Sequence, residues 1–489
     1  MKGMILAAAA LLSGVVGEAG EKARTSDTRR SSVTLESAVA IALKQNPEIL
    51  KALHEIERTR GQVIEVRAQA LPQVGLTGTY TQEDPTLLQS AGGGAVVSSG
   101  GTSSTATTAV VPQATSFSSF GQDKSWRIAI QGTQLLYSGG QVKAALKIAK
   151  LTQDSSYYML RETVGQVIAN VRSQFSTVLL DRELITVSEE SIALLGDQLK
   201  DQKNRFEAGT VPRFNVLQAE VALANAQPDL IRARNNHLIA RLTLAKTLGF
   251  DARQEVDAIG ELRAIPRRVS LPQALATALN LRAILKAQRN TIQTEEQQIT
   301  VAAAGYKPRL EANAGYEMVN SRRSDDLSDE VHGWFFGATG TWNVFDGFQT
   351  KGRIDQAKAR LASAKVNFAD STQQVELEVQ KAFAGVNQAR ELIASQAKVV
   401  EQADEALRLA KERLAAGAGT QLDVLSAQVA RTQARTTQKQ ALSDYNVAIA
   451  EMDRSTGVDT IYDATSTDPR IQKSKTALRG GKAVLRPQD

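Results

Sequence analysis

The sequence predicts an α+β membrane protein, in which a duplicated unit supplies four transmembrane β-strands per protomer together with long coiled-coil helices. Three observations point to this fold class. The chain repeats itself, each half contains segments in which apolar and polar residues alternate, and each half also carries a long proline-free stretch with apolar residues three or four apart. Since none of the 489 residues is cysteine, disulfides, cysteine-based metal sites and cysteine nucleophiles are excluded.

Residues 1–19 are predicted to be a cleaved secretory signal peptide. Lys2 is followed by an uncharged run that ends at Gly17, and small residues lie around Ala19. An N-terminal membrane anchor is the alternative, although the run is shorter than the roughly 20 residues that a spanning helix needs. Because no other apolar stretch reaches that length, we expect any further crossing of a membrane to use β-strands.

The internal repeat sets the domain organisation. We expect a first repeat over 34–249 and a second over 270–457. The early parts match 236 residues apart, as Pro72 and Pro308 do, whereas the later parts match 208 residues apart. The difference lies in a loop rich in Gly, Ser and Thr that only the first repeat contains. Each repeat is therefore one structural unit of the same plan.

Four segments with period-two alternation are predicted to be strands, at about 72–82, 124–137, 308–319 and 333–345. Each has the length that crosses a bilayer as a tilted strand, with polar residues toward a lumen and apolar residues toward lipid. Only Gln134 and Phe335 break the alternation. Aromatic residues at the ends of such strands suit the membrane interface, and the candidates are Tyr80, Trp126, Tyr316, Trp334 and Trp342. Ordinary strands of a small soluble sheet, with the tryptophans in its core, are the alternative.

Four strands are too few to close a membrane barrel, which needs about eight or more. An unpaired strand edge inside lipid leaves backbone groups without partners. Several chains are therefore expected to share one barrel with cyclic symmetry, and lipid is expected around it.

Long helices follow the strands. Apolar residues at coiled-coil spacing predict helices over about 141–205 and 349–413, each roughly 100 Å long. Glycine-containing turns then lead into second helices over about 213–248 and 421–456. Pro228 is expected to kink the first of these.

Several motifs together carry a family resemblance. They are Leu136-Tyr137-Ser138-Gly139-Gly140-Gln141, Val344-Phe345-Asp346-Gly347, and Arg413 followed by Ala416-Gly417, Asp423-Val424-Leu425 and Ala427-Gln428. With the duplicated plan, the chain resembles the TolC-like outer-membrane efflux proteins from about Thr34 to Gly457. The resemblance implies a homotrimer with an α-barrel in the periplasm and a 12-strand barrel in the outer membrane, where outer-membrane lipid surrounds it. It also implies a passive exit duct for efflux or type I secretion, served by an inner-membrane transporter and a periplasmic adaptor.

The resemblance also implies candidate site residues at the far ends of the long helices. The adaptor would dock on the helix tips, at Gly209, Thr210, Val211, Gly417 and Ala418. Acidic rings at the start of the inner helices would gate the periplasmic aperture, and the matching residues are Asp423 in the second repeat with Asn215 and Arg213 in the first. A carboxylate there would favour cations. Equally, Asp423 could simply complement its own helix dipole.

Enzyme classes find no support in the sequence. The histidines His54, His237 and His332 are expected on the surface, on a helix, a helix and a loop, without the spacing of a metal or catalytic site. We expect no cofactor and no metal. The basic tail at 458–489 is expected to be disordered, so its charge does not indicate a nucleic-acid partner. A periplasmic coiled-coil scaffold or adaptor outside the membrane is the alternative function, and a general diffusion porin is a third.

Overall fold

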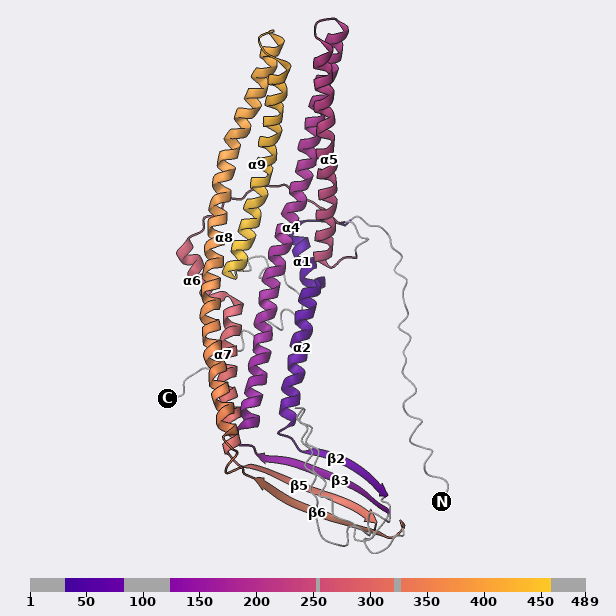
Figure 1. Cartoon of the computed structure of the whole chain (residues 1–489), viewed down its shortest axis with the longest axis vertical. Coiled ribbons are helices and arrows are strands. Elements are labelled where there is room, and N and C mark those ends of the chain that lie inside the picture. The colour runs from indigo at the N-terminus through magenta and orange to yellow at the C-terminus, as the bar shows by residue number, and fades with distance from the viewer. Residues whose placement is uncertain (1–30, 83–123, 252–255, 321–326, 459–489) are drawn as a thin grey trace.

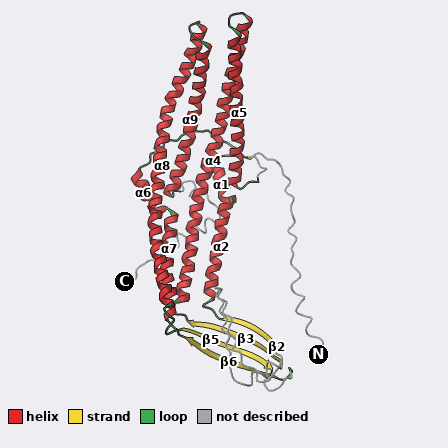
Figure 2. Cartoon of the chain, viewed as in Figure 1, coloured by secondary structure: helices red, strands yellow, loops and turns green. Residues whose placement is uncertain are grey.

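The computed structural model describes residues 31–82, 124–251, 256–320 and 327–458. The predicted signal peptide, most of the long loop of the first repeat and nearly all of the predicted tail lie outside these residues. The described part is elongated, with a sheet at one end and two helical hairpin tips at the other (Figure 1). Nearly all strand residues gather at the sheet end, and the rest is helical (Figure 2).

The sheet has four antiparallel strands in the order β2-β3-β5-β6. They are β2 (Gln73–Gln82), β3 (Lys124–Tyr137), β5 (Arg309–Asn320) and β6 (Glu330–Thr341). Strands from the two repeats meet where β3 pairs with β5, and a bulge lies between Leu135 and Tyr137. Within the described residues, β2 and β6 each keep one edge without a partner strand.

The register places like residues side by side on each face. Leu76, Ile130, Tyr316 and Trp334 stand opposite one another across the four strands and form a row on the apolar face. On the polar face, which bears the odd-numbered residues of these strands, Arg127 of β3 forms an ion pair with Glu317 of β5. The alternation in the sequence therefore corresponds to two chemically distinct faces.

Both exceptions to the alternation have a local cause. The Gln134 amide turns back and donates to the carbonyl oxygens of Ala70 (3.0 Å) and Leu135 (2.9 Å), which satisfies its polar group. Phe335 lies over Gly315 on the polar face, since a Cβ at that glycine would come within 2.6 Å of the phenyl ring.

Long helices make up the remainder. Each repeat carries a 67-residue helix, α4 (Gln141–Glu207) and α8 (Gln349–Ala415), and a 36-residue helix, α5 (Arg213–Leu248) and α9 (Gln421–Thr456). Helix α5 continues through Pro228. The shorter α2 (Pro47–Ala68) and α7 (Ala283–Ala303) pack beside the sheet-proximal halves of α4 and α8, and the 3-10 helix η1 (Ala304–Tyr306) follows α7. None of the described helices has the length and hydrophobicity of a membrane span.

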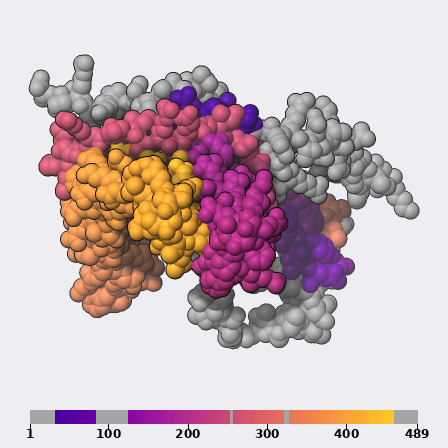
Figure 3. All heavy atoms as spheres, turned by 90° about the horizontal axis from the view of Figure 1, so that it is seen from above, coloured from indigo at the N-terminus to yellow at the C-terminus, as the bar shows by residue number. Residues whose placement is uncertain are grey.

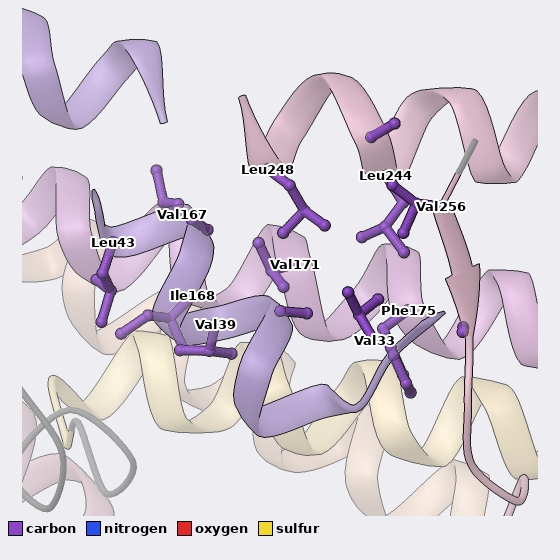
Figure 4. Close-up of a cluster of buried hydrophobic side chains, with 14 of the residues drawn as sticks. Val33, Val39, Leu43, Val167, Ile168, Val171, Phe175, Leu244, Leu248 and Val256 are labelled. Carbon is purple, nitrogen blue, oxygen red and sulfur yellow. The ribbon is translucent and has the colours of Figure 1, made fainter. Parts of the chain in front are cut away.

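Two hydrophobic cores lie midway along the molecule, one in each repeat. In the first, α1 (Leu35–Gln45) and the parallel strands β1 (Ser31–Val33) and β4 (Val256–Ala258) pack on α4 and α5. Figure 4 shows side chains from these segments, among them Val39, Val171 and Leu248, converging on one another. In the second, α6 (Leu271–Leu281) packs on α8 and α9, with Val379 and Val386 fully buried.

Three expectations need correction. Trp342 lies one residue past β6, because the chain leaves the sheet there and its indole N–H donates to the Tyr306 carbonyl oxygen (3.1 Å). His332 is in β6, beside the Tyr316 ring at a centroid distance of 6.0 Å, and not in a loop. His237 is half-buried, and desolvation lowers its pKa.

Candidate functional site

The two helix tips have the same backbone design. Gly209 and Gly417 adopt φ angles of 73° and 74°, and a Cβ on either would meet nothing within 4 Å. The positive φ alone therefore accounts for glycine. The N–H of Thr210 donates to the carbonyl of Arg205 (2.9 Å), and that of Ala418 to Arg413 (2.8 Å), which closes the last turn of each long helix in a Schellman arrangement.

The tips are exposed and lie at the same end of the molecule. Of the five tip residues singled out in the sequence, only Val211 is partly covered. Seen from above, the α8–α9 pair and the α4–α5 pair lie side by side (Figure 3). The structure thus brings the two tips to one end, opposite the sheet.

The helices that leave the tips start differently. Thr420 caps α9, with its hydroxyl accepting from the Asp423 N–H (3.2 Å) while the Asp423 carboxylate accepts from the Thr420 N–H (2.8 Å). This is a capping box. In the first repeat Pro212 occupies the N-cap of α5 and makes no side-chain cap. The duplicated tips are therefore chemically unequal.

Local contacts determine the electrostatics of Asp423. The backbone N–H of Thr420, then its hydroxyl, and the charge of Arg413 lower the pKa of this carboxyl, so it is ionised at neutral pH. In the described structure, neither Arg213 nor Asn215 has a side-chain hydrogen bond or ion pair with it. One chain therefore shows that Asp423 caps its own helix. A gating role would require the same residue from neighbouring chains.

A polar seam between α4 and α9, missed in the sequence, joins the two repeats below the tips. Gln202 and Gln421 are 2% and 5% exposed and hydrogen-bond to each other at 3.1 Å. The Gln428 amide donates to the carbonyl oxygen of Ser191 (3.3 Å). These hydrogen bonds set how α4 and α9 lie against each other, and one buried amide atom of each of the three glutamines has no partner in the described structure.

Ion pairs continue the seam toward the middle of the molecule. Arg435 of α9 pairs with Glu190 of α4 (2.7 Å), and Lys439 pairs with Glu183 (2.8 Å). Arg431 also pairs with Asp404 of α8. The heptad spacing of Glu183 and Glu190 opposite a basic stripe on α9 was the signal that could have revealed this seam.

The aromatic candidates divide between the two ends of the sheet. Tyr80 stands opposite Trp126, and Tyr316 stacks edge-on against Trp334 with ring centroids 4.9 Å apart, toward the loop end. Trp334 is 83% exposed. Trp342 lies at the other end, where the helices begin.

No group of three or more His, Asp or Glu side chains that could hold a metal ion occurs in the described ranges.

Residues 38–250 and 274–458 match the family described as outer membrane efflux protein. The chain belongs to this outer membrane efflux protein family. Its two matched ranges correspond to the two repeats of the fold. Membership places this efflux-family chain in the outer membrane.

Relatives of this efflux-family chain are identical to it at about a quarter of the aligned positions. It is 23% identical to the outer membrane efflux protein BepC of Brucella suis over 309 residues, which cover 62% of this chain and 65% of BepC. It is 24% identical to the outer membrane protein OprJ of Pseudomonas aeruginosa over 403 residues, 81% of this chain and 78% of OprJ. The alignment with BepC thus spans slightly less than two thirds of that relative.

Solved structures share the fold. The outer membrane channel CmeC of Campylobacter jejuni aligns with a TM-score of 0.71 at 16% identity, covering 90% of this chain and 88% of that one. The outer membrane protein VceC of Vibrio cholerae aligns with a TM-score of 0.68 at 16% identity, covering 86% and 96%. At these identities the likeness establishes the architecture of the efflux-family chain.

Proposed function

We propose that this chain is the outer-membrane exit duct of a tripartite efflux or type I secretion system. It conducts substrates passively across the periplasm and the outer membrane. The observation that carries the proposal is the family match over both repeats, on a fold that joins a sheet with one apolar face to helices of about 100 Å. The relatives include an efflux protein, BepC, and the alkaline protease secretion protein AprF, so both kinds of system fit.

The functional unit is a homotrimer with a shared 12-strand barrel. Each chain offers four strands whose outer edges, on β2 and β6, have no partner within the described residues. Val74 and Phe336, on the apolar face of these edge strands, are 71% and 90% exposed. Pairing β2 of one chain with β6 of the next satisfies the edges, and lipid covers the apolar face.

The helices form the periplasmic part. In the trimer, the long helices make an α-barrel that ends at the helix tips, where a periplasmic adaptor docks on Gly209, Thr210, Val211, Gly417 and Ala418. The adaptor links the duct to an inner-membrane transporter. Asp423, with Asn215 and Arg213, lines the aperture, and three copies of the carboxylate favour cations there.

The chain acts as a conduit without enzymatic activity and needs no cofactor. A periplasmic scaffold outside the membrane is the competing function, and a scaffold has no use for a sheet face with strongly exposed Trp334 and Phe336.

Membrane extraction tests the proposal. An integral duct stays in the outer-membrane fraction through high salt and alkaline carbonate, leaves it only with detergent, and has the mass of three chains in native mass spectrometry. Release by salt or carbonate, or a monomeric mass in mild detergent, would favour the scaffold.

A further inference from the structure

A hollow lies where the sheet meets the helices of the second repeat. It has a volume of about 650 Å³ and is bounded by the ends of β5 and β6, by the last turn of α7 and by the first turns of α8, with Ser138 and Gln141 at the start of α4 completing the wall. In Figure 1 this is the corner where α7 and α8 reach the sheet. Its wall carries four basic side chains and one acidic one, which are Lys307, Arg309, Arg353, Arg360 and Glu311.

Most of this positive charge is not neutralised locally. Arg309 donates from Nε to Glu311 Oε1 at 2.6 Å, which pairs one base with the one acid. In the described part of the chain, Lys307, Arg353 and Arg360 have no ion pair. A concave surface lined by charges of one sign concentrates counter-ions more strongly than scattered charges do.

The basic residues of the hollow have no counterparts in the first repeat. The positions that match Lys307 and Arg309 in the first repeat are Leu71 and Gln73, and those that match Arg353 and Arg360 are Ala145 and Thr152. The two helical positions are seven residues apart, so both arginines stand on one face of α8. The first repeat thus has the same fold without these basic residues, so the fold does not require them.

The hollow opens on the polar face of the sheet. Arg309 and Glu311 are odd-numbered residues of β5, on the same face as the Arg127–Glu317 ion pair. Gln298, Gln356 and Thr341 add uncharged polar groups to the wall. In the trimer proposed above, this face borders the lumen, so three copies of the hollow surround the passage at the junction of strands and helices.

We propose that this hollow is an anion-binding site inside the duct, which takes carboxylate or phosphate groups of the cargo as it passes from the helical part into the barrel. Rings of Arg and Lys are the means by which pores favour anions and phosphates. The inference rests on the proposed function, because only in a conducting trimer do the three hollows line a passage.

Block of single pores by tripolyphosphate tests the inference. The full-length protein is inserted into bilayers of zwitterionic lipid only, so that no anionic headgroup competes. Tripolyphosphate is added on the barrel side, from which it reaches the hollow without passing the helix tips. We expect wild-type current to be blocked, and the apparent dissociation constant to rise at least about tenfold in the R353Q/R360Q double variant, with a weaker block at higher ionic strength.

A matched control lies on the same helix. Lys358 and Lys365 are exposed, are also seven residues apart, and are not part of the hollow. The K358Q/K365Q variant removes the same charge and should be blocked like the wild type.

The outcomes are separable. Equal block of R353Q/R360Q and wild type, or no block of open wild-type pores, would overturn the inference and leave the duct in place. Failure of the wild type to form pores would instead remove the proposed function.

Discussion

Asn46 and Arg282 lie at the same corner of the two repeats but stabilise it by different side-chain contacts. Each occupies the N-cap position of the helix that follows it, but only the Asn46 side chain accepts hydrogen bonds from that helix. Each also donates to the last turn of the neighbouring long helix, Asn46 to the Thr247 carbonyl oxygen (2.7 Å) and Arg282 to that of Ser455 (3.4 Å). Arg282 is 4% exposed and also pairs with Glu162 of α4 (3.0 Å) and Glu378 of α8 (3.1 Å). It therefore ties the second repeat to the first.

Replacing Arg282 should destabilise the protein strongly. In Arg282→Met the carboxylates of Glu162 and Glu378 lose a shared partner in a largely buried site, and breaking such a pair costs about 3–5 kcal/mol. Asn46→Ala loses a neutral cap and should cost about 1–2 kcal/mol. Thermal unfolding of the detergent-solubilised protein, followed by circular dichroism, measures both. If the two variants unfold at the same temperature, Arg282 does not hold the repeats together.

The two roles of Asp423 can be separated with Thr420. Asp423→Ala and Thr420→Ala both remove the capping box, but only the first removes a charge. If the carboxylate lines the aperture, Asp423→Ala lowers the cation preference of the pore, and Thr420→Ala leaves it unchanged, since loss of the cap alone costs about 1 kcal/mol of helix stability. Reversal potentials in a salt gradient report the preference. An equal change in the two variants would restrict Asp423 to its helix.

Gly249 should tolerate alanine less well than its counterpart Gly457. Both have positive φ angles, 82° and 70°, which cost an alanine about 1–2 kcal/mol. A Cβ at Gly249 would also lie 2.5 Å from the carbonyl oxygen of Gln45, whereas at Gly457 the nearest atom is 3.4 Å away. We expect Gly249→Ala to lose a further 1–3 kcal/mol or so by overpacking. Chemical denaturation of the two variants measures the difference in the free energy of unfolding. Equal losses would mean that the end of α1 at Gln45 moves aside without a loss of stability.

Acid should loosen the contact between α8 and α9 at Asp404. Burial raises the pKa of this carboxyl, but the hydrogen bond from Arg431 and the charges of Arg435 and Arg431 outweigh it and leave the pKa lowered. A lowered folded pKa means that the pair stabilises the protein above the unfolded pKa, near 3.9, and that this contribution is lost as the pH falls through the folded value. Because the side chains of the pair remain partly exposed to solvent, we expect a contribution of less than about 1 kcal/mol.

Hydrogen exchange of the α8–α9 segment around Asp404 and Arg431 reports this loosening. Protection should decrease on acidification below about pH 4 in the wild type. Asp404→Asn should already show the lower protection at neutral pH and change less with acid. Unchanged wild-type protection across this range would contradict the assignment.

Much of the long-helix architecture could be predicted because its determinants are local. Apolar residues at three- and four-residue spacing indicated a helix from Gln349 to Arg413, and the observed helix ends at Ala415, just before the positive φ of Gly417. Alternation likewise indicated β5 and its two faces. The end of β6 was harder to predict. Trp342 lies just past the strand, and its indole N–H donates to the carbonyl oxygen of Tyr306, which lies 36 positions earlier.

Contacts between the repeats could not be predicted from any single segment of the sequence. Arg282 and Glu162 are 120 positions apart, and nothing local indicates that they pair. The basic hollow combines Arg309 of a strand with Arg353 and Arg360 of a helix, and only the packed corner unites them. By contrast, the capping box was present in the sequence as Thr420 followed three residues later by Asp423.

Conductance tests the exit-duct account most directly. The protein is purified in detergent as its native assembly, its mass is recorded, and it is added to a planar lipid bilayer. The account predicts stepwise insertion of pores of uniform conductance by a species with the mass of three chains. A preparation that stays folded and helical but never inserts would contradict it and would leave a coiled-coil scaffold outside the membrane.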